Sequence, residues 1–305
     1  MMKVKQMLMQ YASGGLKQVF AACNEQIEQS MEIRIRLGKP ILARSTKGEI
    51  RVGSDYTTTS QDIMGMLEKM ANHSLYAFDS EIKNGFITVA GGHRVGICGR
   101  VVLDGGKIKT MRNISGLTIR ISRQIIGAGE HIAKIVTDGR SPLPLHNILI
   151  VSPPSSGKTT VLRDLIRILS NNGCNISVVD ERSEIAGSHN GAAQNDLGAR
   201  TDVLDAAPKA EGMLLMLRAM SPDVIAVDEI GHDADVDALL AIACCGVKII
   251  ATCHAENIED LHKKPAFAPI IKNKIFERYI FLTAKPKPGT VKAVYDKNLQ
   301  EVGGK

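Results

Sequence analysis

The segment 147–160, NILIVSPPSSGKTT, constrains the fold of this chain more than any other. The apolar run 148–151 predicts a buried strand, and a turn rich in Pro, Ser and Gly follows it. A helix is then predicted from Gly157, because apolar residues recur at the spacing of one buried face: Leu162, Leu165, Ile166 and Leu169. Backbone N–H groups and the helix dipole at such a turn both favour a bound anion. The sequence therefore predicts an α/β fold with a phosphate cradle.

The residues of this cradle match a nucleotide-binding loop. We expect Lys158 to reach the β- and γ-phosphates of ATP and the Thr159 hydroxyl to ligate Mg²⁺. The usual pattern, G-x-x-x-x-G-K-[ST], has a glycine where this chain has Ser152, and two prolines follow that stiffen the turn. An ordinary strand–turn–helix with a chance GKT is the alternative. The predicted nucleotide-binding residues are Ser155, Ser156, Gly157, Lys158, Thr159 and Thr160.

A second segment, 224–230, has four apolar residues followed by two acids and predicts another buried strand. We expect this strand to lie beside the phosphate loop, so that its carboxylates reach the metal and the attacking water. Asp228 would hold Mg²⁺ through its water shell, and Glu229 would orient and polarise the water.

Length and patterning predict two domains. The chain has 305 residues, of which 44% are apolar, enough for a sizeable core in each. Before residue 135, strand-like alternation and the hairpin signal at 104–106 indicate a smaller α+β domain. Residues 136–147 are predicted to be a linker, and 148–305 alternate strands and helices as in a mostly parallel sheet. The polar segment 187–201 is predicted to be a long loop.

Charge is unevenly placed. Residues 1–140 carry 20 Lys/Arg against 12 Asp/Glu, giving +8, and residues 141–305 carry 18 against 20, giving −2. A basic half can face nucleic acid, a membrane, an acidic partner or the nucleotide of a neighbouring subunit. Aromatic residues are only 4% and Trp is absent, which argues against a nucleic-acid partner. The longest apolar stretch is too short to span a bilayer, so we expect a cytoplasmic protein that docks on a membrane.

Several further segments resemble the type II/type IV secretion and pilus-retraction ATPases. The acidic box 180–184, DERSE, the segment 217–225 before the second strand, and the histidine box 246–255 occur in that order. Four segments are closest to the stage III sporulation protein AA branch: GHRVG, TDVLD, PKAEG and DEIG. The broader group usually has Gly-Glu where this chain has Asp228-Glu229. The resemblance implies a RecA-like P-loop ATPase domain, a hexamer, and integral membrane channel proteins as partners during endospore formation.

The same resemblance implies further site residues. Glu181, with Glu184, would order the attacking water or the magnesium shell, and His254 would approach the γ-phosphate or Glu229. The alternatives are a solvated strand end for the acids and a backbone-bonded histidine. The segment 116–123 resembles an arginine-bearing strand of the secretion ATPases, which points to inter-subunit arginines, whereas a solvated strand face is the alternative. The candidates are Arg94, Arg100, Arg120 and Arg123.

These features lead to one main hypothesis. The chain is expected to be an ATP-hydrolysing motor subunit that powers assembly of, or transport through, a membrane-associated secretion-like channel. Two alternatives stay open. One is a translocase stimulated by nucleic acid. The other is a nucleotide-gated scaffold with little turnover, which the serine at 152 favours.

Overall fold

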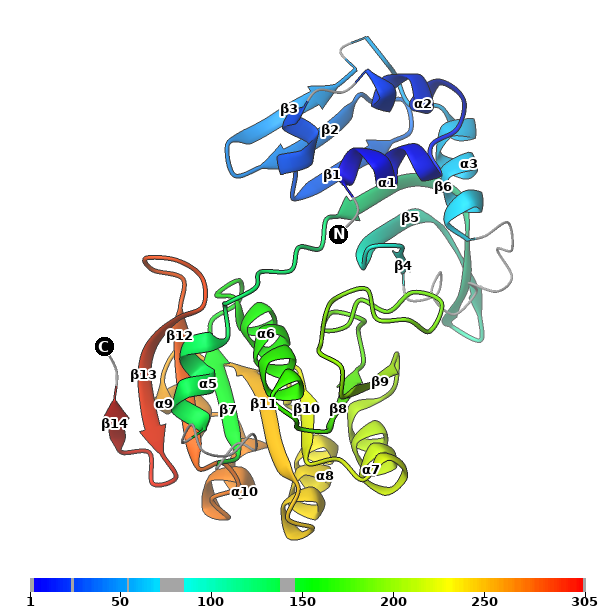
Figure 1. Cartoon of the computed structure of the whole chain (residues 1–305). Coiled ribbons are helices and arrows are strands. Elements are labelled where there is room, and N and C mark those ends of the chain that lie inside the picture. Colours follow the sequence, from blue (N-terminus) through cyan, green and yellow to red (C-terminus); the bar gives the residue numbers. More distant parts are fainter. Residues whose placement is uncertain (1–2, 23–24, 54, 72–84, 138–145, 304–305) are drawn as a thin grey trace. The chain divides into compact units, whose positions relative to one another are not determined.

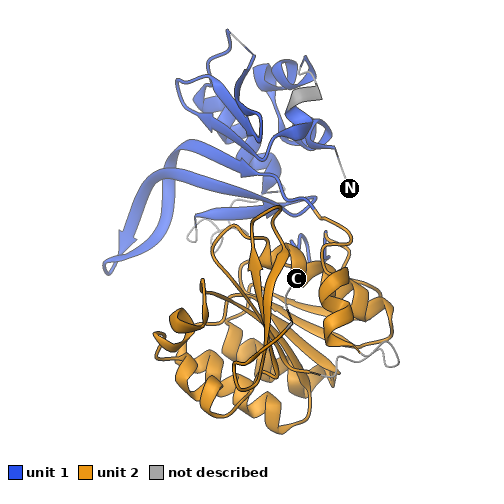
Figure 2. Ribbon diagram, turned by 90° about the vertical axis from the view of Figure 1, so that its left-hand side faces the viewer, with its two compact units in different colours: residues 1–123, 187–194 blue, residues 124–186, 195–305 orange. Residues whose placement is uncertain are grey.

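The computed structural model describes residues 3–22, 25–53, 55–71, 85–137 and 146–303. The chain forms two compact units (Figure 2). Unit 1 comprises residues 1–123 with 187–194, and unit 2 comprises residues 124–186 with 195–305.

Unit 1 is built on a six-stranded sheet in the order β3-β2-β1-β6-β5-β4, all of whose neighbouring pairs are antiparallel. Ile33 and Ile35 alternate with Glu32 and Arg34 along β1, so only one face of the sheet is apolar. Three helices pack their buried residues on that face (Figure 1). The elements are α1 (Val4–Tyr11), α2 (Gly14–Ala21), the 3₁₀ turn η1 (Glu25–Gln29), β1 (Glu32–Arg36), β2 (Ile41–Ser45), β3 (Gly48–Val52), α3 (Ser60–Met70), β4 (Phe86–Val89), β5 (His93–Asp104) and β6 (Lys107–Arg120).

Unit 2 contains an eight-stranded sheet in the order β14-β13-β12-β7-β11-β10-β8-β9. The six strands from β12 to β9 are parallel, and β13 and β14 extend the β12 edge antiparallel. The elements are α5 (Glu130–Val136), β7 (Ile148–Ser152), α6 (Lys158–Asn171), β8 (Ile176–Asp180), β9 (Thr201–Asp205), α7 (Lys209–Met220), β10 (Val224–Val227), α8 (Asp233–Cys244), β11 (Lys248–His254), α9 (Ile258–His262), α10 (Phe267–Lys272), β12 (Arg278–Thr283), β13 (Thr290–Asp296) and β14 (Glu301–Gly303).

Helices cover both faces of this sheet. Along β7, Ile148 and Ile150 belong to the core that includes α5 and α6, whereas Leu149 and Val151 belong to the core that includes α7, α8 and α10. A strand buried on both sides reads as a continuous apolar run, as in β7 and β10, and β8 is equally buried although Ser177 interrupts its apolar residues. The predicted α/β fold with a mostly parallel sheet, preceded by a smaller α+β region, is confirmed.

The strand that ends before Asp228 reaches the phosphate loop, as expected: the Asp228 carboxylate lies 2.6 Å from the Thr159 hydroxyl, although β11 separates β10 from β7. Two details differ from the expectations. The β9 strand was not predicted; its half-exposed edge position gives no buried apolar run. The units divide between Arg123 and Gln124, so α5 is part of unit 2. Of the predicted linker, residues 138–145 lie outside the described residues.

Candidate nucleotide site

The predicted phosphate cradle lies at the carboxyl end of β7. Ser155 has φ 61° and Gly157 has φ 88°, so the loop turns sharply before α6 begins at Lys158. A Cβ on Gly157 would lie 3.0 Å from the Gly289 nitrogen, so this position needs glycine for space as well as conformation. The Gly289 N–H donates to the Ser156 carbonyl at 2.8 Å, which braces the loop from the β12–β13 connection. Ser152 is fully buried, and its hydroxyl donates to the Pro153 carbonyl at 2.9 Å.

Lys158 points from the start of α6 toward the end of β11. Its Nζ lies 2.9 Å from Nδ1 of His254. Burial lowers the pKa of Lys158, while the charges of Asp228 and Glu229 oppose this decrease. The ammonium therefore lies between a histidine and two carboxylates, at the strand ends where phosphates bind in such folds.

Thr159 and Asp228 form an oxygen pair suited to magnesium. The Thr159 hydroxyl donates to Asp228 Oδ2 at 2.6 Å. The Thr252 hydroxyl donates to the other carboxylate oxygen and accepts the Glu229 N–H at 2.9 Å, which fixes the Asp228 side chain. Mg²⁺ prefers oxygen ligands and commonly takes only one or two from protein, the rest from water and phosphate. Over the described ranges no group of three or more His, Cys, Asp and Glu forms a metal cage, which is compatible with such a site.

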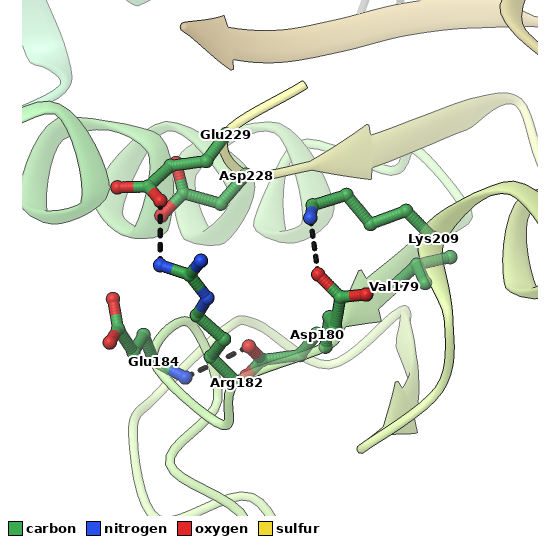
Figure 3. A pocket seen from close by; sticks show the side chains of 8 residues that line it. Val179, Asp180, Arg182, Glu184, Lys209, Asp228 and Glu229 are labelled. Atoms are coloured by element: carbon green, nitrogen blue, oxygen red, sulfur yellow. Dashed lines mark hydrogen bonds and ion pairs between the residues drawn. The ribbon is translucent and has the colours of Figure 1, made fainter. Parts of the chain in front are cut away.

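Glu229 is held from two sides in a strained backbone conformation, with φ 54°. Its Oε1 lies 2.9 Å from His254 Nε2, and its Oε2 accepts from Arg182 Nη1 at 2.9 Å (Figure 3). Burial raises the pKa of Glu229, but the hydrogen bond from His254 and the charges of His254, Arg182 and Lys158 outweigh burial and lower it. The side chain is therefore a carboxylate at neutral pH.

The acidic box is organised around Asp180, which ends β8. Its buried carboxylate accepts the N–H groups of Glu184, Ile185 and Ala186 at 2.8, 3.0 and 2.8 Å. Burial raises the pKa of Asp180 to about 6, although these hydrogen bonds lower it. Arg163 on α6 donates to the carbonyls of Ile185 and Glu184 at 2.8 and 2.6 Å. The phosphate-loop helix and the acidic box are therefore tied directly together.

A small pocket opens at the ends of β8 and β10 (Figure 3). Glu181, one of its lining residues, forms an ion pair with the buried Lys209. Glu184 also lines the pocket and is close enough to Lys158 to influence its pKa. The lining residues are Val179, Asp180, Glu181, Arg182, Glu184, Lys209, Asp228 and Glu229.

The structure thus brings most of the predicted site residues of unit 2 together. Lys158, His254 and Glu229 are connected by contacts of 2.9 Å, and Thr159 and Asp228 form a second pair at 2.6 Å. Ser155, Ser156 and Thr160 flank Lys158 and Thr159 on the loop and the first turn of α6. Glu181 lies at the pocket with its carboxylate on Lys209.

The four predicted arginines of unit 1 have different surroundings. Arg94 and Arg120 pair across β5 and β6, and both line a cleft with Arg34 on the sheet face opposite the core. Arg94 also lies 3.6 Å from the centre of the Phe86 ring. Arg100 is exposed and faces Arg112 in the hairpin, whereas Arg123 donates to the carbonyls of Glu28 and Ser30.

Sequence reasoning did not assign a role to three residues of this site. Arg182, Thr252 and Arg163 contact Glu229, Asp228 and the acidic-box carbonyls, respectively. Arg182 lies inside the acidic box and Thr252 inside the histidine box. Their positions in these two segments are the sequence feature that could have indicated a role at the site. Arg163 is buried in α6, and nothing in the local sequence pattern distinguishes it from a solvated helix residue.

Comparison with known proteins agrees with this arrangement. The family model described as "Sporulation stage III, protein AA" matches residues 2–302. "Stage III sporulation protein AA" of Bacillus subtilis (strain 168) is 42% identical over 273 residues, covering 88% of this chain and 87% of the relative.

Solved structures show the same fold at low identity. The pilus retraction motor PilT with bound ADP has a TM-score of 0.60 at 14% identity, covering 92% of this chain and 78% of that one. The Yersinia pseudotuberculosis ATPase DotB has a TM-score of 0.58 at 14% identity, covering 89% and 75%. With the phosphate loop, the sheet order and the sequence matches in place, this chain belongs to the stage III sporulation protein AA family and has a RecA-like P-loop fold.

Proposed function

We propose that this chain is the ATP-hydrolysing motor subunit of a membrane-associated, secretion-like assembly that acts during endospore formation. The observation that carries the proposal is the continuous set of contacts from Lys158 through His254 to Glu229, beside the Thr159–Asp228 pair. A phosphate-binding lysine, two oxygen ligands for Mg²⁺ and a carboxylate that is ionised at neutral pH are the groups that phosphoryl transfer to water requires.

Each side chain has a defined task in this proposal. When ATP binds, Lys158 exchanges its contact with His254 for contacts with the β- and γ-phosphates, because one ammonium cannot bind closely to both partners. Thr159 would hold Mg²⁺ directly and Asp228 through its water shell, and the ion would supply charge neutralisation at the phosphates. Glu229 then accepts the proton of the attacking water, and His254 keeps the Glu229 carboxylate oriented through Nε2.

The acidic box would support this chemistry indirectly. Glu184 lies near Lys158 and is proposed to order water beside the γ-phosphate. Glu181, expected to share that task, is proposed to position the pocket wall through its ion pair with Lys209. Arg163 links the phosphate-loop helix to the same box. A movement of this helix when the phosphates change would therefore be transmitted to Glu184 through the Arg163 side chain.

We further propose a homo-oligomeric ring, a hexamer, in which Arg94 or Arg120 approaches the nucleotide of a neighbouring subunit. Both arginines line one cleft on the exposed sheet face of unit 1, whereas Arg123 is engaged with two carbonyls of its own chain. The partners would be integral membrane channel proteins, reached from the cytoplasmic face. No helix in the described part of the chain is long and apolar enough to cross a bilayer.

Phosphate release from purified protein tests the proposal. Wild type should hydrolyse ATP, whereas Lys158→Ala should lose nearly all activity; Lys292→Ala, which removes an exposed lysine from β13, is the matched control. Equal release from wild type and Lys158→Ala would refute the site. Tight ATP binding without turnover in the oligomer would instead favour the nucleotide-gated scaffold.

A further inference from the structure

The hairpin of β5 and β6 is longer than the sheet that carries it. β4 pairs with β5 only over residues 93–96, and β1 pairs with β6 only over residues 116–120. Throughout the described sequence, the stretches 100–104 and 107–112 pair only with each other. In Figure 2 the two long strands of unit 1 run together to a turn that lies beyond the other strands of that unit. We call residues 100–112 the ribbon.

One face of the ribbon is apolar and exposed. Val101 pairs with Met111, and Leu103 pairs with Ile108. Val101 and Leu103 are two positions apart on one strand, so these four side chains share a face. Met111, the one farthest from the turn, packs against the core of unit 1. Val101, Leu103 and Ile108 are 44, 60 and 46% exposed. Single apolar residues are common on surfaces, whereas a cluster of them on a ribbon that is only marginally stable by itself indicates a docking site.

The charges of the ribbon indicate what it docks on. Four basic residues stand against one acid, Asp104, which forms an exposed ion pair with Lys109 at 3.0 Å. Arg100 and Arg112 pair on the face opposite the apolar one, and Lys107 lies at the turn. The ribbon is a single layer of two strands, and long basic side chains can extend beyond its edges. Positive charge therefore lies on the face opposite the apolar tip and at the turn, next to the apolar side chains. The four basic residues are Arg100, Lys107, Lys109 and Arg112.

We propose that the ribbon inserts its tip into an anionic lipid surface. Leu103 and Ile108 would enter the boundary between headgroups and acyl chains, while the lysines and arginines contact lipid phosphates. A protein partner that covers the apolar face would leave the Arg100–Arg112 face uncovered. A bilayer surrounds an inserted tip on both faces and matches both the apolar cluster and the charge. This inference rests on the proposed membrane association and is independent of ATP hydrolysis.

Vesicle binding of the purified full chain tests the inference. We expect the protein to co-sediment with vesicles of phosphatidylcholine and phosphatidylglycerol, and far less with phosphatidylcholine alone or at high salt. Leu103→Asp should lower the partition coefficient by about tenfold or more. Leu215→Asp, which changes a residue 48% exposed on α7, is the matched control and should leave binding unchanged.

The lysines are tested separately. Lys107→Gln and Lys109→Gln should each weaken vesicle binding about fivefold, because each removes a charge near the lipid surface. Lys292→Gln, in unit 2, should have no effect. Circular dichroism and thermal unfolding of every variant verify that the fold is retained.

Three results would overturn the inference. Vesicle binding could be equal with and without phosphatidylglycerol, or Leu103→Asp could behave like Leu215→Asp. Alternatively, Leu103→Asp could change the oligomer mass while vesicle binding persists, in which case the ribbon contacts a second copy of the chain. Phosphate release measured without lipid separates these failures from a failure of the proposed motor function.

Discussion

Arg182 and Glu229 form an ion pair, with Nη1 and Oε2 separated by 2.9 Å, although they lie 47 positions apart in the chain. The side chain of Arg182 is 57% exposed and that of Glu229 is 27% exposed. This pair attaches the proposed catalytic base to the acidic box, and the opposite side of the same carboxylate is held by His254.

The pair makes a prediction about pH dependence. Glu229 must be deprotonated to act as a base, and the charge of Arg182 is one of the causes that lower its pKa. Arg182→Ala should therefore raise the pKa of Glu229 and move the acid limb of the kcat/KM profile to higher pH. Arg182→Lys should retain most of the wild-type profile, and Arg200→Ala is a control elsewhere in unit 2. An unchanged acid limb in Arg182→Ala would contradict the proposed role of this pair.

The magnesium pair makes a second prediction. Asp228→Asn and Thr159→Ala each remove an oxygen ligand or its charge, so the Mg²⁺ concentration for half-maximal hydrolysis should rise by roughly 10- to 100-fold. Thr159→Ser keeps the hydroxyl and should stay close to wild type. A magnesium titration of phosphate release measures this directly. Identical Mg²⁺ dependence in Asp228→Asn and wild type would rule out a role of Asp228 in holding Mg²⁺.

Asp180 makes a prediction about stability. Burial raises its folded-state pKa from 3.8 to about 6, so the folded protein binds a proton more tightly than the unfolded chain does. Stability from this group is therefore present at low pH and lost as pH rises through about 4 to 6, by about 3 kcal/mol in total. Urea unfolding at several pH values should show this slope in wild type but not in Asp180→Asn. Parallel pH profiles for the two proteins would refute the prediction.

The arginines of unit 1 can be tested by subunit mixing. If Arg120 acts on the nucleotide of a neighbour, Arg120→Ala should lower phosphate release by roughly a thousandfold. Mixing it with Lys158→Ala should then restore part of the activity, because some interfaces combine an intact Lys158 with an intact Arg120. The same mixture made with Arg94→Ala tests the other cleft arginine. Absence of any recovery in both mixtures, with oligomers verified by mass, would contradict a trans role.

Much of the fold was predictable because buried parallel strands leave a strong signal. The apolar runs of β7 and β10, the mostly apolar β8 and the one-sided apolar pattern of α6 identified the α/β architecture. The order of the strands was less accessible. Nothing in the run 248–254 indicates that β11 inserts between β7 and β10, because strand order depends on crossovers and packing rather than on local pattern.

The site was predictable to the extent that its residues fall in compact motifs. Lys158, Thr159, Asp228, Glu229 and His254 were identified in three segments, and the structure brings them together. Side-chain pairing was not predictable. The sequence names Glu181, with Glu184, for ordering the attacking water, and only the position of Lys209 on α7 shows that the Glu181 carboxylate is paired.

The single-turnover rate of Glu229→Gln tests the central claim most directly. The account predicts that this variant binds ATP and Mg²⁺ as wild type does, since Lys158, Thr159 and Asp228 are intact. Hydrolysis of the bound ATP should be slower by roughly a thousandfold, because the proton acceptor for water is lost. Hydrolysis by Glu229→Gln at the wild-type rate, with ATP bound equally well, would contradict the assignment of Glu229 as the base.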